Sequence, residues 1–213
     1  KNIERAAAHF QVKINIRQPL KTGLIVEYHY ADDAFTMLRA DIDALPVVEE
    51  TGWDFSSKNQ NMHACGHDVH TAALYGFLLY VLENLPKRNF LFLFQPAEEA
   101  VGGAEMILKS GLLDDYAIDK VFALHVNDDF KAGTIATNDA TLFASSYELD
   151  VEFFGTSAHV AFPKNGKNAL SALRIFMDQV EKIPQNYIRP IIYGIGKVEA
   201  GTVRNVVPGY AKL

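Results

Sequence analysis

Apolar and polar positions along the first part of the chain predict strands and a helix of an α/β domain. Residues 23–30 (GLIVEYHY) and 35–40 (FTMLRA) are apolar runs separated by the polar pair Asp32-Asp33, and this spacing predicts a β-hairpin. Residues 70–85 predict a buried helix that ends before a proline. These segments supply two strands and one covering helix.

Two further apolar runs follow that helix. Residues 90–94 (FLFLF) are apolar without interruption, which is typical of a strand covered on both faces. A short helix is predicted over 104–113, and residues 121–126 (VFALHV) predict another buried strand. The order strand, helix, strand, helix, strand is typical of an α/β sheet with helices on its faces.

The pattern changes after about Ala144, where a second domain is predicted to start. Its predicted elements are a half-exposed strand, an amphipathic helix and two further strands, over residues 147–154, 168–183, 191–200 and 211–213. One solvated sheet face and one helix are typical of a small α+β domain. We therefore expect two domains, residues 1–144 and 145–213.

Composition narrows the class of protein without naming a function. The 213 residues are 49% hydrophobic and 22% charged, which excludes a disordered or collagen-like chain. The net charge of -6 argues against nucleic-acid binding. No apolar run approaches the ~20 residues of a membrane helix, so we expect a soluble protein. The single cysteine excludes an internal disulfide and favours a cytoplasmic location.

Both ends of the sequence fall inside predicted elements. Lys1 lies in a predicted helix and Leu213 in a predicted strand. We therefore expect the 213 residues to be part of a longer polypeptide.

Polar residues with metal-binding side chains follow the predicted strands or precede the predicted helix. The four segments are RADIDALP (39–46), HACGHDVH (63–70), QPAEE (95–99) and His125. Because the carboxyl ends of strands in an open α/β sheet meet at one crevice, we expect these segments to converge. Thiol, imidazole and carboxylate together are the ligands of a divalent transition metal.

Each of these residues taken alone also has a purely structural explanation. A lone cysteine such as Cys65 is most often a small buried hydrophobe, and His125 could be a hydrogen-bonded core histidine. Paired glutamates are usually solvated, and Asp41 and Asp43 could be turn residues. The coincidence of all four segments favours a metal site. A cysteine-protease arrangement is weaker, because the neighbouring histidines are too close in sequence to act across a cleft.

The same strings, together with ALHV (123–126), resemble the metal-dependent aminoacylase/carboxypeptidase family of amidohydrolases. They are similar to the branch that contains hippurate hydrolases, auxin-conjugate hydrolases and N-acetyldiaminopimelate deacetylases. Residues 133–163 are most similar to the last of these. The resemblance implies a zinc-exopeptidase-like sheet with helices on both faces and a small ferredoxin-like lid and dimerisation domain.

The resemblance also implies roles for individual residues. The metal ligands around a two-metal centre would be Cys65, His67, Glu99 and His125, with the thiolate bridging the ions. Glu98 would be the general base, and Asp41 and Asp43 would orient the ligands, with Asp41 expected as the second catalytic residue. The metal would be zinc, manganese, cobalt or nickel.

Two residues of the second domain complete the implied site. His159 matches a histidine that reaches the catalytic centre of a dimer partner and stabilises the oxyanion, and Asn205 matches an asparagine that contacts substrate. We therefore expect a homodimer that forms through the lid domain. The family also has an opening segment and a C-terminal return segment of the first domain that would lie outside residues 1–213. Its last part carries a further histidine ligand that would follow Leu213, which implies weak metal binding by residues 1–213 alone.

The activity implied is removal of an acyl group from an N-acyl amino acid. N-acetyl-L,L-diaminopimelate is the expected substrate, with diaminopimelate and acetate as products in lysine biosynthesis. Hippurate hydrolase, aminoacylase and dipeptidase activities remain open, because no motif separates them. A dimerisation fragment without enzymatic activity is the remaining alternative.

Overall fold

The computed structural model describes residues 1–31, 33–99, 102–139, 141, 144–183 and 191–213. Their contacts divide the chain into two compact units, Lys1–Thr134 and Ile135–Leu213. No helix in the described part of the chain has both the length and the apolar character needed to span a membrane.

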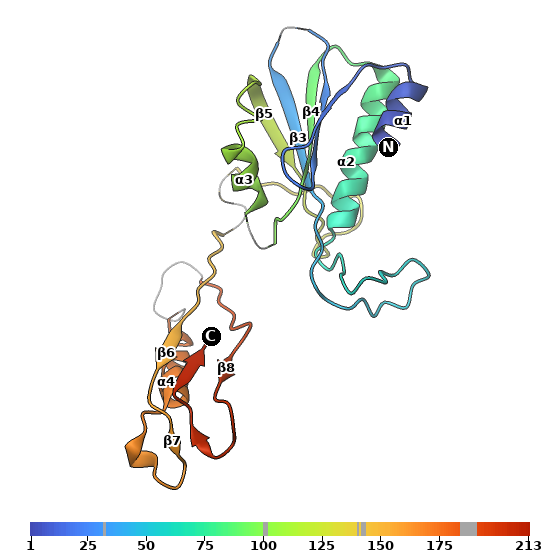
Figure 1. Cartoon of the computed structure of the whole chain (residues 1–213). Helices are drawn as coiled ribbons and strands as arrows, with labels where there is room; N and C mark the ends of the chain where they lie inside the picture. Colours follow the sequence, from blue (N-terminus) through green and yellow to red (C-terminus); the bar gives the residue numbers. More distant parts are fainter. Residues whose placement is uncertain (32, 100–101, 140, 142–143, 184–190) are drawn as a thin grey trace. The chain divides into compact units, whose positions relative to one another are not determined.

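The first unit is built on a five-stranded mixed sheet with the order β1-β2-β4-β3-β5 (Figure 1). The strands are β1 (Asn15–Arg17), β2 (Leu24–Tyr28), β3 (Phe35–Asp41), β4 (Asn89–Gln95) and β5 (Ile118–Ala123). β3 is parallel to both β4 and β5, whereas β2 is antiparallel to β1 and β4. The carboxyl ends of β3, β4 and β5 therefore lie at the same edge of the sheet.

The predicted hairpin of β2 and β3 is wrong. Both strands form, but β4 lies between them and pairs with each. All seven residues of β4 are buried, so this strand takes the centre of the sheet and the polar turn becomes a connection across it. Asp33 lies in this connection, and Asp32 lies outside the described residues.

Helices cover both faces of the sheet, as predicted. α1 (Asn2–His9) and α2 (His67–Asn84) pack on one face, where the side chains of Phe90, Phe92 and Phe94 point. α3 (Gly103–Lys109) covers the other face, where Leu91 and Leu93 join its cluster (Figure 1). The alternation along β4 therefore fills two separate cores.

Three further predicted elements of the first unit differ from the structure. α3 ends at Lys109 rather than at residue 113. α2 begins at His67 rather than three residues later, because Gly66 adopts the left-handed conformation that starts the helix. β5 is not buried: Val121 is 58% exposed and Phe122 56% exposed. β5 lies at the edge of the sheet and pairs only with β3 among the described strands.

The second unit is a small α+β unit. Its elements are β6 (Glu152–Phe154), β7 (Ala158–His159), the 3-10 helix η1 (Pro163–Asn165), α4 (Ala169–Val180), β8 (Glu199–Ala200), β9 (Val206–Val207) and β10 (Tyr210–Lys212). β6, β10 and β8 form an antiparallel sheet against which Leu173 of α4 packs, and β7 pairs with β9. The strand predicted over 191–200 is reduced to its last two residues.

Candidate metal centre

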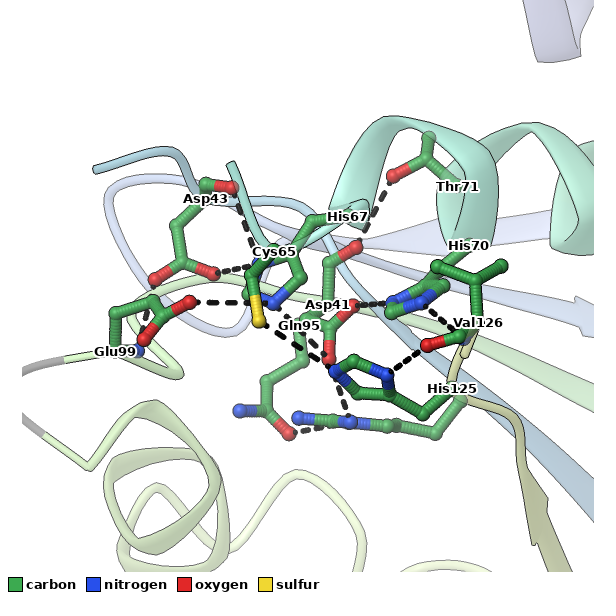
Figure 2. A network of polar contacts seen from close by, with 11 residues as sticks. Asp41, Asp43, Cys65, His67, His70, Thr71, Gln95, Glu99, His125 and Val126 are labelled. Carbon is green, nitrogen blue, oxygen red and sulfur yellow. Dashed lines mark hydrogen bonds and ion pairs between the residues drawn. The ribbon is translucent and has the colours of Figure 1, made fainter. Parts of the chain in front are cut away.

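The predicted site residues of the first unit come together at the carboxyl edge of its sheet (Figure 2). Asp41 ends β3, and Asp43 follows two residues later. Glu98 and Glu99 follow β4, and His125 follows β5. Because β3, β4 and β5 are parallel, the loops after them converge there with the first turn of α2.

Three clusters of possible metal ligands among the described residues share His67, and two of them are made of the residues expected at the metal centre. The first combines His67 with Cys65 and His125, and the second combines it with Glu98 and Glu99, with the ligand atoms of each cluster within 4.8 Å of one another. Cys65 Sγ lies 3.5 Å from His125 Nε2. The structure thus brings together the four residues that the family resemblance implies as ligands, Cys65, His67, Glu99 and His125.

Two buried atoms at the centre of these clusters have no hydrogen-bond partner among the described residues. They are His67 Nε2 and Glu99 Oε1, which lie 3.5 Å apart. A buried imidazole nitrogen and a buried carboxylate oxygen without a partner are costly unless a cation satisfies both. These two atoms, which lack hydrogen-bond partners, and the nearby thiol, imidazole and carboxylate groups fit a divalent transition metal.

Asp43 fixes the orientation of His67. His67 Nδ1 lies 3.1 Å from both the carboxylate and the backbone carbonyl of Asp43, and both of these groups are acceptors. The Nδ1 position therefore carries the proton, and Nε2 presents its lone pair to the cluster. The second oxygen of the same carboxylate accepts the backbone N–H of Glu99 at 3.0 Å.

Asp41 has different partners from Asp43. It is 1% exposed and accepts a hydrogen bond from Arg39 at 2.9 Å and one from His70 at 2.5 Å. Burial acts to raise the pKa of Asp41, but the His70 hydrogen bond and the Arg39 charge outweigh it, so its pKa is lowered. Asp41 is therefore a buried carboxylate anchored by a cation and an imidazole, 3.8 Å from His67 Nε2.

His70 is a site residue that the sequence pattern did not single out. It forms a third cluster with Asp41 and His67, but neither of its nitrogens is available to a metal. Nδ1 bonds Asp41, and Nε2 accepts the backbone N–H of Val126 at 2.9 Å. Its position three residues after His67 in α2, on the same helix face, is the signal that could have identified it.

The thiol of Cys65 lies among negative charges. Burial raises the pKa of Cys65, and the carboxylates of Glu99, Glu98 and Asp41 raise it further. A divalent cation would offset this accumulation of negative charge and favour the thiolate.

The remaining predicted residues, His159 and Asn205, lie together in the second unit. His159 in β7 pairs with Val206 in β9, and the N–H of Val160 donates to the carbonyl of Asn205 at 3.0 Å. His159 Nδ1 accepts the N–H of Ala161, and its side chain is exposed.

Comparison with known proteins assigns this arrangement to a family. Residues 37–197 match the model of peptidase family M20/M25/M40. The chain belongs to this family. A curated relative, the N-acetyldiaminopimelate deacetylase of Streptococcus uberis, is 43% identical over 198 residues, which cover 91% of this chain and 53% of the relative. The corresponding deacetylase of Lactococcus lactis is 42% identical, covering 91% of this chain and 52% of that protein.

Two solved structures share this fold. A dinuclear metal-binding peptidase of the family from Bacillus subtilis is 32% identical, with a TM-score of 0.66, and matches 99% of this chain and 55% of its own. A putative aminohydrolase from Staphylococcus aureus, at 24% identity and a TM-score of 0.68, has the same fold over 99% of this chain and 58% of its own. This M20 chain thus spans about half the length of the relatives it matches.

Proposed function

We propose that this protein is the metal-binding part of an amidohydrolase that removes the acetyl group from N-acetyl-L,L-diaminopimelate. The observation that carries the proposal is the buried, unpartnered pair of His67 Nε2 and Glu99 Oε1, 3.5 Å apart at the junction of two ligand clusters. The substrate is supported by the two deacetylases at 43% and 42% identity. The products would be diaminopimelate and acetate.

Two divalent metal ions would be held by Cys65, His67, Glu99 and His125. The solved Bacillus subtilis relative, a dinuclear metal-binding peptidase, supports a pair of ions rather than one. A thiolate among imidazoles favours zinc, manganese, cobalt or nickel over magnesium and calcium.

Glu98 is proposed as the general base. Its side chain is exposed, whereas that of Glu99 is half-buried, so the two neighbours present their carboxylates to different surroundings. Bound metal would polarise the amide carbonyl and lower the pKa of the attacking water. Glu98 takes a proton from that water as the C–O bond forms, and delivers it to the amine nitrogen as the C–N bond breaks.

The second unit is proposed as a ferredoxin-like lid and dimerisation domain. His159 and Asn205, adjacent on β7 and before β9, would contribute to substrate binding and oxyanion stabilisation across a homodimer. The exposed side chain of His159 is consistent with a contact made to another surface.

The experiment that tests the function uses the complete polypeptide that contains these residues. Loaded with Zn²⁺, Mn²⁺, Co²⁺ or Ni²⁺, it should release acetate from N-acetyl-L,L-diaminopimelate faster than it hydrolyses hippurate or a dipeptide. Glu98→Gln should lower kcat about 10²–10⁴-fold while metal content is unchanged. Equal turnover by parent and Glu98→Gln would overturn the role of Glu98.

Peptidase activity is the second candidate, because the Bacillus subtilis relative is a peptidase. The same centre would act on a peptide bond, so only the substrate preference distinguishes the two activities. A higher kcat/KM for the dipeptide than for the acetylated amino acid would favour this candidate.

A further inference from the structure

The loop after β5, which carries His125, is attached to the start of α2 through the buried side chain of His70. His70 is fully buried, and its Nε2 accepts the backbone N–H of Val126 at 2.9 Å. The carbonyl of the same residue, Val126, accepts Nδ1–H of His125 at 2.7 Å. The N–H of Val126 is therefore bound by His70 of α2, and its carbonyl is bound by His125 of the loop itself.

The protonation of these rings follows from their partners. A backbone N–H can only donate, so Nε2 of His70 carries no proton, and its Nδ1 donates to Asp41 at 2.5 Å. In the same way the Val126 carbonyl can only accept, so His125 is protonated at Nδ1. His125 then directs the lone pair of Nε2 toward Cys65 Sγ, 3.5 Å away.

Packing reinforces this attachment from a second side. A Cβ added at Gly66 would lie 2.5 Å from Cγ2 of Val126. Val126 is therefore held between Gly66 and His70, which begin α2 and lie on either side of His67 in sequence. The rings of His70 and His125 also meet edge to face, with centroids 4.6 Å apart.

We infer that His70 is a positioning residue that sets the orientation of the metal ligand His125 through the backbone of Val126. The chain of contacts runs from the Asp41 carboxylate through His70 and Val126 to His125 (Figure 2). His70 binds neither metal nor substrate. The inference rests on the proposed metal-dependent function, because it assigns the orientation of one of the ligands.

Two substitutions distinguish the contact of His70 with Asp41 from its contact with Val126. In His70→Asn the short amide can still donate to Asp41 but cannot reach the N–H of Val126. In His70→Gln the longer side chain places an acceptor where Nε2 stood, so the contact with Val126 is kept. Leu78→Ala is the matched control, because Leu78 is fully buried in the same helix and belongs to the hydrophobic core.

Titration of the complete polypeptide that contains these residues with Co²⁺ measures the effect without turnover. The thiolate-to-cobalt absorption reports Cys65, and the ligand-field bands report the geometry of the bound ion. His70→Asn should raise the Co²⁺ dissociation constant about 10- to 100-fold and change the ligand-field bands. His70→Gln should remain within a few fold of the parent, and Leu78→Ala should keep the parent's dissociation constant and spectrum while unfolding at a lower temperature.

A double-mutant cycle tests whether His70 acts through His125. In a His125→Ala background, His70→Asn should have no further effect on Co²⁺ affinity. Three results would overturn the inference and leave the metal site standing. The losses of Co²⁺ affinity in the two single variants could be additive, or His70→Asn could bind Co²⁺ as tightly as the parent. Alternatively, His70→Gln could lose Co²⁺ affinity while His70→Asn retains it. Absence of Co²⁺ binding by the parent would overturn the metal site and the inference together.

A measurement on the unsubstituted chain covers the case in which the variants do not fold. A two-bond ¹⁵N–¹⁵N coupling between the Val126 amide and His70 Nε2 should be detectable by NMR in the metal-free protein. Its absence would overturn the inference whatever the variants do.

Discussion

His67 donates Nδ1–H to the carboxylate of Asp43 at 3.1 Å, and the other oxygen of that carboxylate accepts the N–H of Glu99 at 3.0 Å. One side chain therefore sets the orientation of two proposed metal ligands from different loops. Hydrogen bonds of this kind fix the ring and raise the basicity of a metal-bound histidine. Asp43 is thus better placed to orient the ligands than Asp41, whose oxygens are used by Arg39 and His70.

Replacing Asp43 should therefore weaken metal binding without removing a ligand. Asp43→Asn loses the charge and one of the two acceptors, so we expect Co²⁺ affinity to fall about 10- to 100-fold. Asp68→Asn is the matched control, because Asp68 is exposed in the first turn of α2 beside His67. Isothermal titration of both variants measures the difference, and equal affinity in Asp43→Asn and the parent would contradict the role assigned to Asp43.

Asp41 should make the unfolding free energy depend on pH. Its pKa in the folded chain lies below the ordinary value of 3.8, because the contributions of His70 and Arg39 exceed the effect of burial. A lowered folded pKa gives a stabilisation that is present above pH 3.8 and is lost as pH falls through the folded pKa. The charged form, and not the acid, is the one that the fold stabilises.

The comparison of parent with Asp41→Asn isolates this contribution. Urea unfolding of both metal-free proteins from pH 6 to pH 2 should show a stability difference that narrows below pH 3.8. Acidic groups elsewhere titrate in both proteins, so their contributions cancel in the difference between the two unfolding free energies. A difference that stays constant across this range would mean that the pKa of Asp41 is not lowered.

The ligand segments could be predicted because strand ends and metal-binding side chains are both local features of the sequence. QPAEE and His125 follow strands whose apolar runs are recognisable, so their convergence follows from sheet topology. The order of strands could not be predicted in the same way. A polar turn such as that at Asp33 suits a hairpin as well as a crossover, and only the packing of β4 against both cores decides between them.

The roles of residues that act through hydrogen bonds to distant segments also could not be predicted from the sequence. Asp41 and Asp43 are two residues apart, and nothing local indicates which one contacts His67. His70 resembles any buried helix residue until the backbone of Val126, 56 positions later, is placed beside it. Such contacts between distant segments require the folded chain.

The edge strand β5 should promote self-association of the 213-residue chain. Val121 and Phe122 are 58% and 56% exposed, and β5 pairs only with β3 in the described part of the structure. An exposed apolar edge strand is a template for pairing with a second chain. Val121→Lys should therefore lower the concentration-dependent increase in mass seen by sedimentation.

A control for this prediction lies outside the sheet edge. Ile192 is 91% exposed in the second unit and is not part of a strand. Ile192→Lys makes the same change of apolar side chain to cation, so it should alter the sedimentation of the chain less than Val121→Lys does. An equal effect of the two substitutions would assign the change to net charge rather than to β5.

Gly103, the first residue of α3, should tolerate no side chain. A Cβ there would lie 1.8 Å from the carbonyl oxygen of Pro96, in the segment that leads to Glu98 and Glu99. Because that neighbour is backbone, Gly103→Ala must displace the segment, and we expect the unfolding free energy to fall by about 1–3 kcal/mol. Metal affinity should fall with it, since the displaced backbone positions Glu99.

Gly76 in α2 offers a comparison, because its replacement by alanine should raise the unfolding free energy rather than lower it. A Cβ at Gly76 meets no atom within 4 Å, and the residue lies in the helix interior. Gly76→Ala should therefore stabilise the protein by about 0.5–1 kcal/mol through helix propensity alone. Denaturant unfolding of the two variants, with Co²⁺ titration of each, compares them directly. If both variants were stabilised, the close approach of Gly103 to the Pro96 carbonyl would not exist in solution. The proposal that α3 positions Glu98 and Glu99 through this contact would then be wrong.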